Sequence, residues 1–230
     1  MSKSHVASLT PGATTSDRSY FWQAKVASLF GIVPLGVFVV VHLYNNLSAF
    51  YGAATWEKNL THDTHPLTML LTMVVVVAPL IIHSLWGIAR TIRMRNNWPQ
   101  YGYLRNFRYL LQRITAVGAL AFLVAHMWLA WIRPRFVEGH GETFADISAQ
   151  MHWHLPTLIV YVLGTAGIAY HLANGISTAL MGFGVTATKD AKRKLDWVAY
   201  LILVILLAMS WGAIYALWLG APATPPANLH

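Results

Sequence analysis

The chain has 230 residues, of which 56% are hydrophobic and only 10% are charged, and its mean hydropathy is +0.48. A soluble domain carries about 25% charged residues, so this composition excludes a water-soluble globule and also a disordered chain. The absence of cysteine excludes disulfides, thiolate zinc sites, cysteine-ligated iron–sulfur clusters and covalently attached c-type haem. The net charge of +8 is interpreted first as a topology signal, and we expect no nucleic-acid partner.

Five apolar stretches predict membrane-spanning helices, because roughly 20 mostly apolar residues cross the hydrocarbon core of a bilayer. In chain order these stretches cover about residues 26–47, 66–89, 109–132, 155–181 and 197–219. Polar or Gly/Pro-containing connections separate them, and the sequence has no internal repeat. We therefore expect a single membrane domain over residues 1–230.

Charged residues are distributed unevenly between the two sides of these spans. Basic residues concentrate in the N-terminal segment, around the connection between the second and third spans, and in the connection between the fourth and fifth. Since cytoplasmic loops carry the excess of Lys and Arg, we expect the N-terminus in the cytoplasm and the C-terminus outside. The N-terminal segment lacks the apolar core and cleavage site of a signal peptide, so the first span should be retained.

Each of the first four spans contains one deep histidine: His42, His83, His126 and His171. Ionisable residues inside a membrane are costly and usually functional. Each lies about two-thirds of the way along its span, and consecutive spans run in opposite directions. His42 and His126 should therefore share a level near the outer face, and His83 and His171 a level nearer the cytoplasm. With a rise of 1.5 Å per residue, the two levels differ by ~12 Å.

Two histidines that face each other at one level suit haem iron, whose porphyrin supplies four nitrogens and leaves two axial positions open. A bare zinc or copper ion would need three or four protein ligands, and no Asp or Glu lies within the apolar cores. Two alternatives stay open on this reasoning. The histidines could simply pack against backbone carbonyls, or they could serve a transporter or metal-ion carrier directly.

Several segments resemble the dihaem cytochrome b membrane anchor of succinate:menaquinone oxidoreductases, in its single-anchor, five-helix form. The segments that carry this resemblance are residues 28–43, 79–88, 111–128, 170–176 and 182–188. The similarity extends over nearly all of residues 20–219. It implies an all-α integral membrane protein with five transmembrane helices, in which the first four form a haem-binding four-helix bundle and the fifth lies alongside.

By this resemblance, His42 and His126 ligate the iron of a distal haem b, and His83 and His171 ligate that of a proximal haem b. The implied role is the membrane-anchor cytochrome b subunit of a succinate dehydrogenase, which passes electrons from succinate through the two haems to menaquinone. FAD and iron–sulfur clusters belong to a flavoprotein subunit and an iron–sulfur subunit on the cytoplasmic side of a bacterial inner membrane. This chain alone is therefore not expected to oxidise succinate.

The alternative is the cytochrome b subunit of a fumarate reductase or of another quinone-linked respiratory enzyme. Some fumarate-reducing relatives carry a glutamate two residues before the fourth histidine. The corresponding residue here is Ala169, which favours the succinate-oxidising direction.

Two further sets of polar residues are candidates for contacts with bound groups. Haem propionates are anionic, and Ser28, Gln112 and Arg113 are expected to bind them near the proximal haem. Reducing a quinone takes two protons, so polar side chains near the outer face are candidates for its site. These are Tyr44, Asn45, Glu57, His62, Asp63 and His65.

Overall fold

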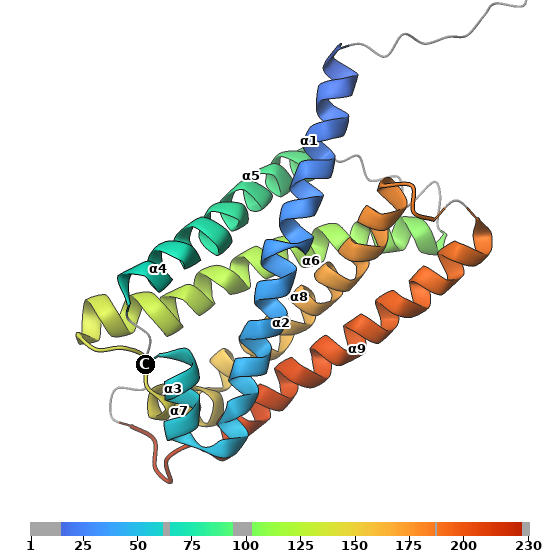
Figure 1. Cartoon of the computed structure of the whole chain (residues 1–230). Coiled ribbons are helices and arrows are strands. Elements are labelled where there is room, and N and C mark those ends of the chain that lie inside the picture. The colour runs from blue at the N-terminus through green and yellow to red at the C-terminus, as the bar shows by residue number, and fades with distance from the viewer. Residues whose placement is uncertain (1–14, 62–64, 94–102, 187, 227–230) are drawn as a thin grey trace, which may run out of the picture.

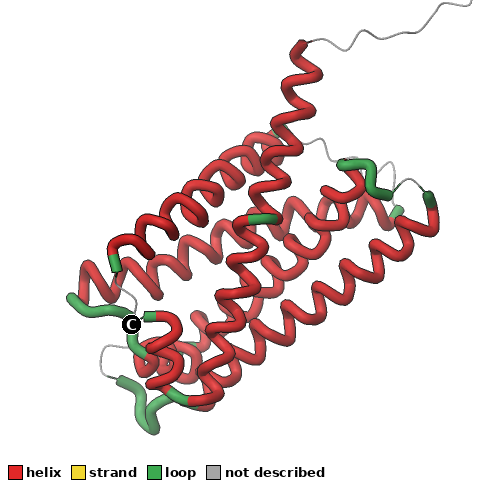
Figure 2. The backbone as a smooth tube through the Cα atoms, in the orientation of Figure 1, coloured by secondary structure: helices red, strands yellow, loops and turns green. Residues whose placement is uncertain are grey.

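The structure is a computed structural model, and it describes residues 15–61, 65–93, 103–186 and 188–226. Helices joined by short turns make up this part of the chain, and it contains no strand (Figure 2). Five helical segments within it are long and apolar enough to cross a membrane: Trp22–Tyr51, Pro66–Ile92, Asn106–Glu138, Leu155–Gly182 and Lys189–Leu219. The predicted all-α membrane protein with five spans is thereby confirmed.

The first span is built from two helices, α1 (Thr15–Ile32) and α2 (Pro34–Asn46), followed by a 3-10 turn, η1 (Leu47–Tyr51). The break falls before Pro34, which has no N–H to bond to the preceding turn. Val33 nevertheless keeps helical dihedral angles, with φ −74° and ψ −64°, so the two helices continue one another. Figure 1 shows α1 extending beyond the other helices at one end of the molecule.

The second and third spans contain π-helical turns near their prolines. The second consists of α4 (Pro66–Thr72), η2 (Met73–Val77) and α5 (Ala78–Ile92). The third consists of α6 (Leu104–Met127) and two π turns, η3 (Trp128–Ile132) and η4 (Pro134–Glu138). Because a proline cannot donate the regular helical hydrogen bond, wider turns accommodate it. The third span therefore continues to Glu138, beyond the boundary predicted at residue 132, and Gly139 ends it with a φ of +78°.

Two connections that the sequence predicted as polar loops contain helices, α3 (Ala53–Leu60) and α7 (Phe144–Trp153). They lie together at one end of the molecule (Figure 1). The Thr143 side chain and Asp146 form a reciprocal capping box that starts α7, which satisfies two otherwise unpaired N–H groups. We call this end the α7 end, and we call the opposite end, where α8 ends and α9 begins, the basic end.

The fourth and fifth spans are single long helices, α8 (Leu155–Gly182) and α9 (Lys189–Leu219). The start of α9 lies well before the predicted residue 197, because the Thr188 hydroxyl accepts a hydrogen bond from Ala191 N at 3.1 Å and caps the helix. The long helix α9 packs along α8 and also contacts α2 and α7. This is the predicted position of a fifth helix beside the bundle.

Close packing of α6 on α8 forms the most extensive helix contact of the fold. A Cβ at Gly164 on α8 would lie 2.2 Å from the ring of Phe122 on α6. The missing side chain therefore sets how closely these two helices approach, as small residues do in membrane interfaces. At the basic end, Arg108 on α6 and Asp196 on α9 form an ion pair at 2.6 Å.

We expect Gly164→Ala to destabilise the protein by about 1–3 kcal/mol, the usual effect of overpacking a tight interior. The ring atoms that meet the new methyl group belong to a residue that is itself buried, with 7% of Phe122 exposed. Thermal unfolding in detergent, followed by circular dichroism, measures the change. Gly87→Ala is the matched control, since a Cβ there meets nothing within 4 Å. Equal melting temperatures for the two variants would contradict this account of the α6–α8 contact.

Candidate functional site: two facing pairs of histidines

The histidine pair nearer the α7 end consists of His42 on α2 and His126 on α6. Their ring centres lie 5.9 Å apart, with an angle of 72° between the ring planes. An aromatic ring one helical turn earlier stacks on each imidazole: Phe38 on His42 at 5.3 Å, and Phe122 on His126 at 5.6 Å. These rings restrict the imidazoles, so both point toward the space between the two helices.

The histidine pair nearer the basic end consists of His83 on α5 and His171 on α8. Their ring centres lie 6.1 Å apart, and the ring planes make an angle of 78°. His83 lies against Gly31 of α1, where a Cβ would come within 2.6 Å of the imidazole Cε1. A side chain at position 31 would therefore displace the ring, and glycine keeps the space open.

Both distances suit two imidazoles on opposite sides of one metal ion. A metal–imidazole bond is about 2 Å long, and the ligating nitrogen is about 1 Å from the ring centre, so ligated ring centres are roughly 6 Å apart. Crossed ring planes are compatible with this arrangement, because each imidazole rotates freely about its own metal bond. The donor set is two neutral nitrogens per pair, as axial haem ligation requires.

Hydrogen bonds orient three of the four imidazoles through Nδ1. His83 Nδ1 donates to Ala27 O at 2.9 Å, and His126 Nδ1 lies 3.1 Å from the Tyr161 hydroxyl. His171 Nδ1 lies 3.4 Å from Gln112 O, which can accept from it, and 3.0 Å from Gln112 Nε2, an amide nitrogen that only donates. A hydrogen bond donated by Nδ1 fixes the ring and leaves Nε2 for a metal, which is the usual arrangement around histidine ligands.

His42 differs from the other three histidines. Its Nε2 lies 3.3 Å from the side-chain amide nitrogen of Asn46, which also donates to His42 O at 2.8 Å. Trp56 Nε1 in turn donates to Asn46 Oδ1 at 3.4 Å. Binding of a metal through His42 Nε2 would therefore require the Asn46 amide to turn away. The i,i+4 spacing of these two residues on one helix was an available sequence signal for this contact.

The candidates for binding propionates lie at different positions around the second pair. The Gln112 side chain contacts three groups of α8. Its Nε2 lies 3.0 Å from His171 Nδ1 and donates to His171 O, and its Oε1 accepts from Asn174 Nδ2 at 2.8 Å. Arg113 has a buried Nε with no hydrogen-bond partner among the described residues, and its guanidinium lies 5.2 Å above the Tyr109 ring. Ser28 donates to Ala24 O at 2.9 Å within its own helix. The unpartnered donor on Arg113 fits an anionic group of a ligand, since a buried donor without a partner is costly.

The candidates for binding a quinone are scattered rather than gathered. Tyr44 is 71% exposed and Asn45 is partly buried on the same helix. Glu57 accepts a hydrogen bond from Phe144 N at 2.9 Å, which joins α3 to α7, and His65 caps the start of α4. His62 and Asp63 lie outside the described residues.

A cavity of about 260 Å³ near the first pair was missed in the sequence analysis. It lies between the parts of the third span and α8 that are nearer the α7 end. Its polar lining comes from Arg133, Gln150, His154, Thr157 and Tyr161, and its apolar lining includes Trp128, Leu129 and Val160. Tyr161 connects it to His126. The sequence did carry a signal for this cavity. Arg133 follows His126 by seven residues, and residues seven apart lie on nearly the same face of a helix.

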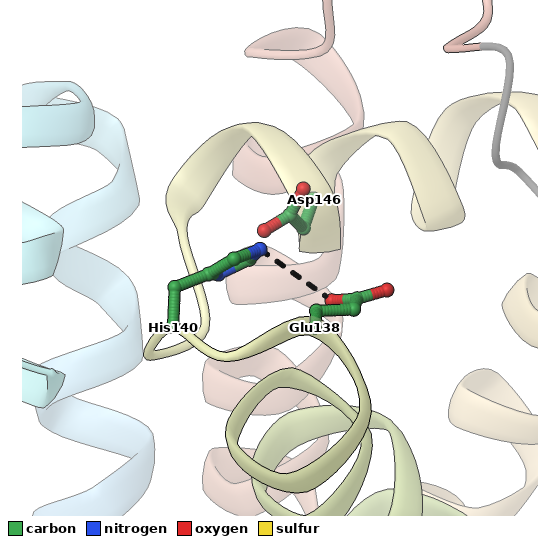
Figure 3. A group of neighbouring side chains, drawn as sticks. All are labelled: Glu138, His140 and Asp146. Carbon is green, nitrogen blue, oxygen red and sulfur yellow. Dashed lines mark ion pairs between the residues drawn. The ribbon is translucent and has the colours of Figure 1, made fainter.

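Near this cavity, Glu138, His140 and Asp146 have ligand atoms within 4.8 Å of one another (Figure 3). Structural bonds already engage both carboxylates. Arg133 donates to Glu138 at 2.8 Å, and the Thr143 hydroxyl donates to Asp146 at 2.6 Å. We therefore interpret these three residues as structural, because their bonds hold the connection between the third span and α7 in place.

The chain is similar to the succinate dehydrogenase cytochrome b558 subunit of Bacillus subtilis (strain 168). The two are 29% identical over 197 residues, a match that covers 85% of this chain and 96% of the relative. No protein-family model matches the chain, and no solved structure matches it significantly. The near-complete coverage of the relative confirms the resemblance to succinate dehydrogenase cytochrome b anchors that the sequence motifs predicted.

On the prediction of one haem per histidine pair, we expect Gly31→Val to remove one haem and leave the other, because the new side chain occupies the position of the His83 ring. Haem per protein, measured as the pyridine haemochrome of the purified protein, should fall by about half. Gly118→Val is the control, since a Cβ at position 118 meets nothing within 4 Å. Full haem content in Gly31→Val would show that His83 can ligate from another position.

Proposed function

We propose that this homologue of the succinate dehydrogenase cytochrome b558 subunit is the membrane-anchor cytochrome b of a succinate dehydrogenase, and that it delivers electrons to menaquinone through two b haems. The observation that carries the proposal is the double pair of imidazoles, with ring centres 5.9 and 6.1 Å apart inside a bundle of membrane-spanning helices. The similarity to the Bacillus protein supplies the enzyme class. Bound in the two pairs, haem b supplies one-electron redox chemistry at two levels of the membrane.

The residues of the chain have separable tasks in this proposal. His42 and His126 bind the distal haem iron, and His83 and His171 bind the proximal one. Hydrogen bonds between Nδ1 and backbone or side-chain oxygens hold the rings and tune their basicity as ligands. Ser28, Gln112 and Arg113 are proposed to bind the propionates of the proximal haem.

The basic end is proposed to face the cytoplasm and to dock the two partner subunits, an FAD-containing flavoprotein and an iron–sulfur protein. The positive-inside rule supports this orientation, because Lys and Arg concentrate at the basic end. Arg108 there is held by Asp196 at 2.6 Å, so it braces the end of the bundle. The α7 end, with the C-terminus, is then on the outer side of a bacterial inner membrane.

We place the quinone head group in the cavity between the third span and α8. This cavity combines apolar walls with hydrogen-bond donors at Arg133 and Gln150 and the imidazole of His154, which suits a flat ring with two carbonyl oxygens. It is also linked to the first histidine pair, because Tyr161 lies 3.1 Å from His126. The earlier candidates, Tyr44, Asn45, Glu57, His62, Asp63 and His65, stay predictions for the same substrate.

Ala169 supports succinate oxidation as the working direction. It is 2% exposed and packs with Leu172 and Leu206, so a carboxylate at this position would be buried among apolar groups at high cost. A proton path through a glutamate at this point of α8 has no counterpart here.

The experiment that tests this proposal is spectroscopy of the purified complex. We expect low-spin bis-imidazole haem spectra and two haems per chain, both reducible by succinate. His126→Ala should remove the distal haem and retain the proximal one, and His83→Ala should do the reverse. Loss of the same haem in both variants would contradict the pairing, and a colourless protein would exclude the cytochrome assignment altogether.

A further inference from the structure

Glu142 lies in the connection between η4 and α7, beside the cavity that we assign to the quinone. Its carboxyl lines a separate, smaller cavity of about 30 Å³. Since a water needs about 10–15 Å³ of such volume, the smaller cavity has room for one or two waters. Polar side chains surround it: Arg133, Glu138, Asp146 and Gln150.

The neighbouring carboxylates have structural partners, and Glu142 belongs to neither of their groups. Glu138 is paired with Arg133 at 2.8 Å, with His140 3.8 Å from its other oxygen. Asp146 is held in the capping box of α7 with Thr143. Among the described carboxyls around this cavity, Glu142 is therefore the one that is not committed to holding the fold together.

The two cavities adjoin each other. Leu129, Arg133 and Gln150 line both of them. From Gln150, hydrogen bonds lead into the larger cavity, because the Thr157 hydroxyl donates to Gln150 Oε1 at 3.2 Å and lies 2.7 Å from His154 Nδ1. Glu142 is thus separated from the quinone cavity by water-sized space and by residues that line both cavities.

We propose that Glu142 supplies the protons that reduction of the quinone consumes, taking them from the aqueous phase at the α7 end. This inference rests on the proposed function. The quinone gains two electrons, which come from succinate oxidation in the partner subunits, and each of its two carbonyl oxygens gains one proton. Glu142 gives up one proton at a time and takes another from water, so it is unchanged after each cycle.

The electrostatics around Glu142 suit this task. Burial raises the pKa of its carboxyl to about 8, an effect that Asp146 reinforces and Arg135 opposes. The carboxyl therefore holds its proton at neutral pH and loses it as the pH rises through about 8. The other titratable or charged groups of the surrounding elements are Arg133, Glu138 and His140 before α7, Glu57 on α3 and Tyr161 on α8.

The test is Glu142→Gln in the complete complex, since Gln resembles the protonated carboxyl in size but cannot release a proton. We expect succinate–quinone turnover to fall about 10²-fold, the usual scale of general acid catalysis. Haem content and reduction of the haems by succinate should match the wild type. During turnover the haems should remain more reduced than in the wild type, because their oxidation by the quinone has become slow. The wild-type rate should decline above about pH 8, and this decline should be absent in the variant.

Glu142→Asp is the matched control: it restores an ionisable carboxyl at this position and is expected to recover most of the rate. Wild-type turnover with an unchanged pH profile in Glu142→Gln would overturn the inference. Loss of haem from that variant would also overturn it, by assigning Glu142 a structural role. A wild-type complex without haem or without quinone reduction would instead refute the proposed function.

Discussion

The rest of the structure depends on two pairs of imidazoles, and in each pair the two rings face each other across the bundle. An imidazole in a membrane interior is stable when its polar nitrogens have partners. In three of the four rings Nδ1 lies beside an oxygen of this chain, at Ala27 O, the Tyr161 hydroxyl and Gln112 O. The chain therefore orients the rings, and we propose that a ligand shared by the other ring nitrogens completes each pair.

Glycine determines how closely the helices can approach around these rings. Gly31 gives His83 its space, and Gly164 lets α6 and α8 meet beneath Phe122, whose ring stacks on His126 at 5.6 Å. Packing between membrane helices relies on such close contacts because lipid provides no hydrophobic drive for association. The same contacts that hold the helices together thus also fix the positions of the imidazoles.

Polar side chains at the α7 end are proposed to serve proton exchange. At the α7 end, Arg133, Glu138 and Asp146 fasten the connection that carries Glu142. The helical continuation of the third span to Glu138 brings these groups beside the cavity proposed for the quinone, where a flexible loop would not hold them. Proton exchange and electron transfer are thereby proposed to meet in the same place, next to His126.

The sequence alone determined the five spans and the assignment of one deep histidine to each of the first four. It also determined which histidines share a level, because hydrophobic length and alternating helix direction fix depth without any tertiary contact. Helix boundaries depended on local bonds. Thr188 starts α9 early, and the π turns at Pro134 lengthen the third span.

Tertiary structure alone decided which side chains surround the site. The cavity between the third span and α8, and the connection of Gln150 to His154 through Thr157, join residues from different helices. Spacing along one helix does not define such neighbours, since they depend on how helices rotate and approach each other. For this reason the histidines could be found from their depth, whereas Glu142 and the quinone cavity needed the packed bundle.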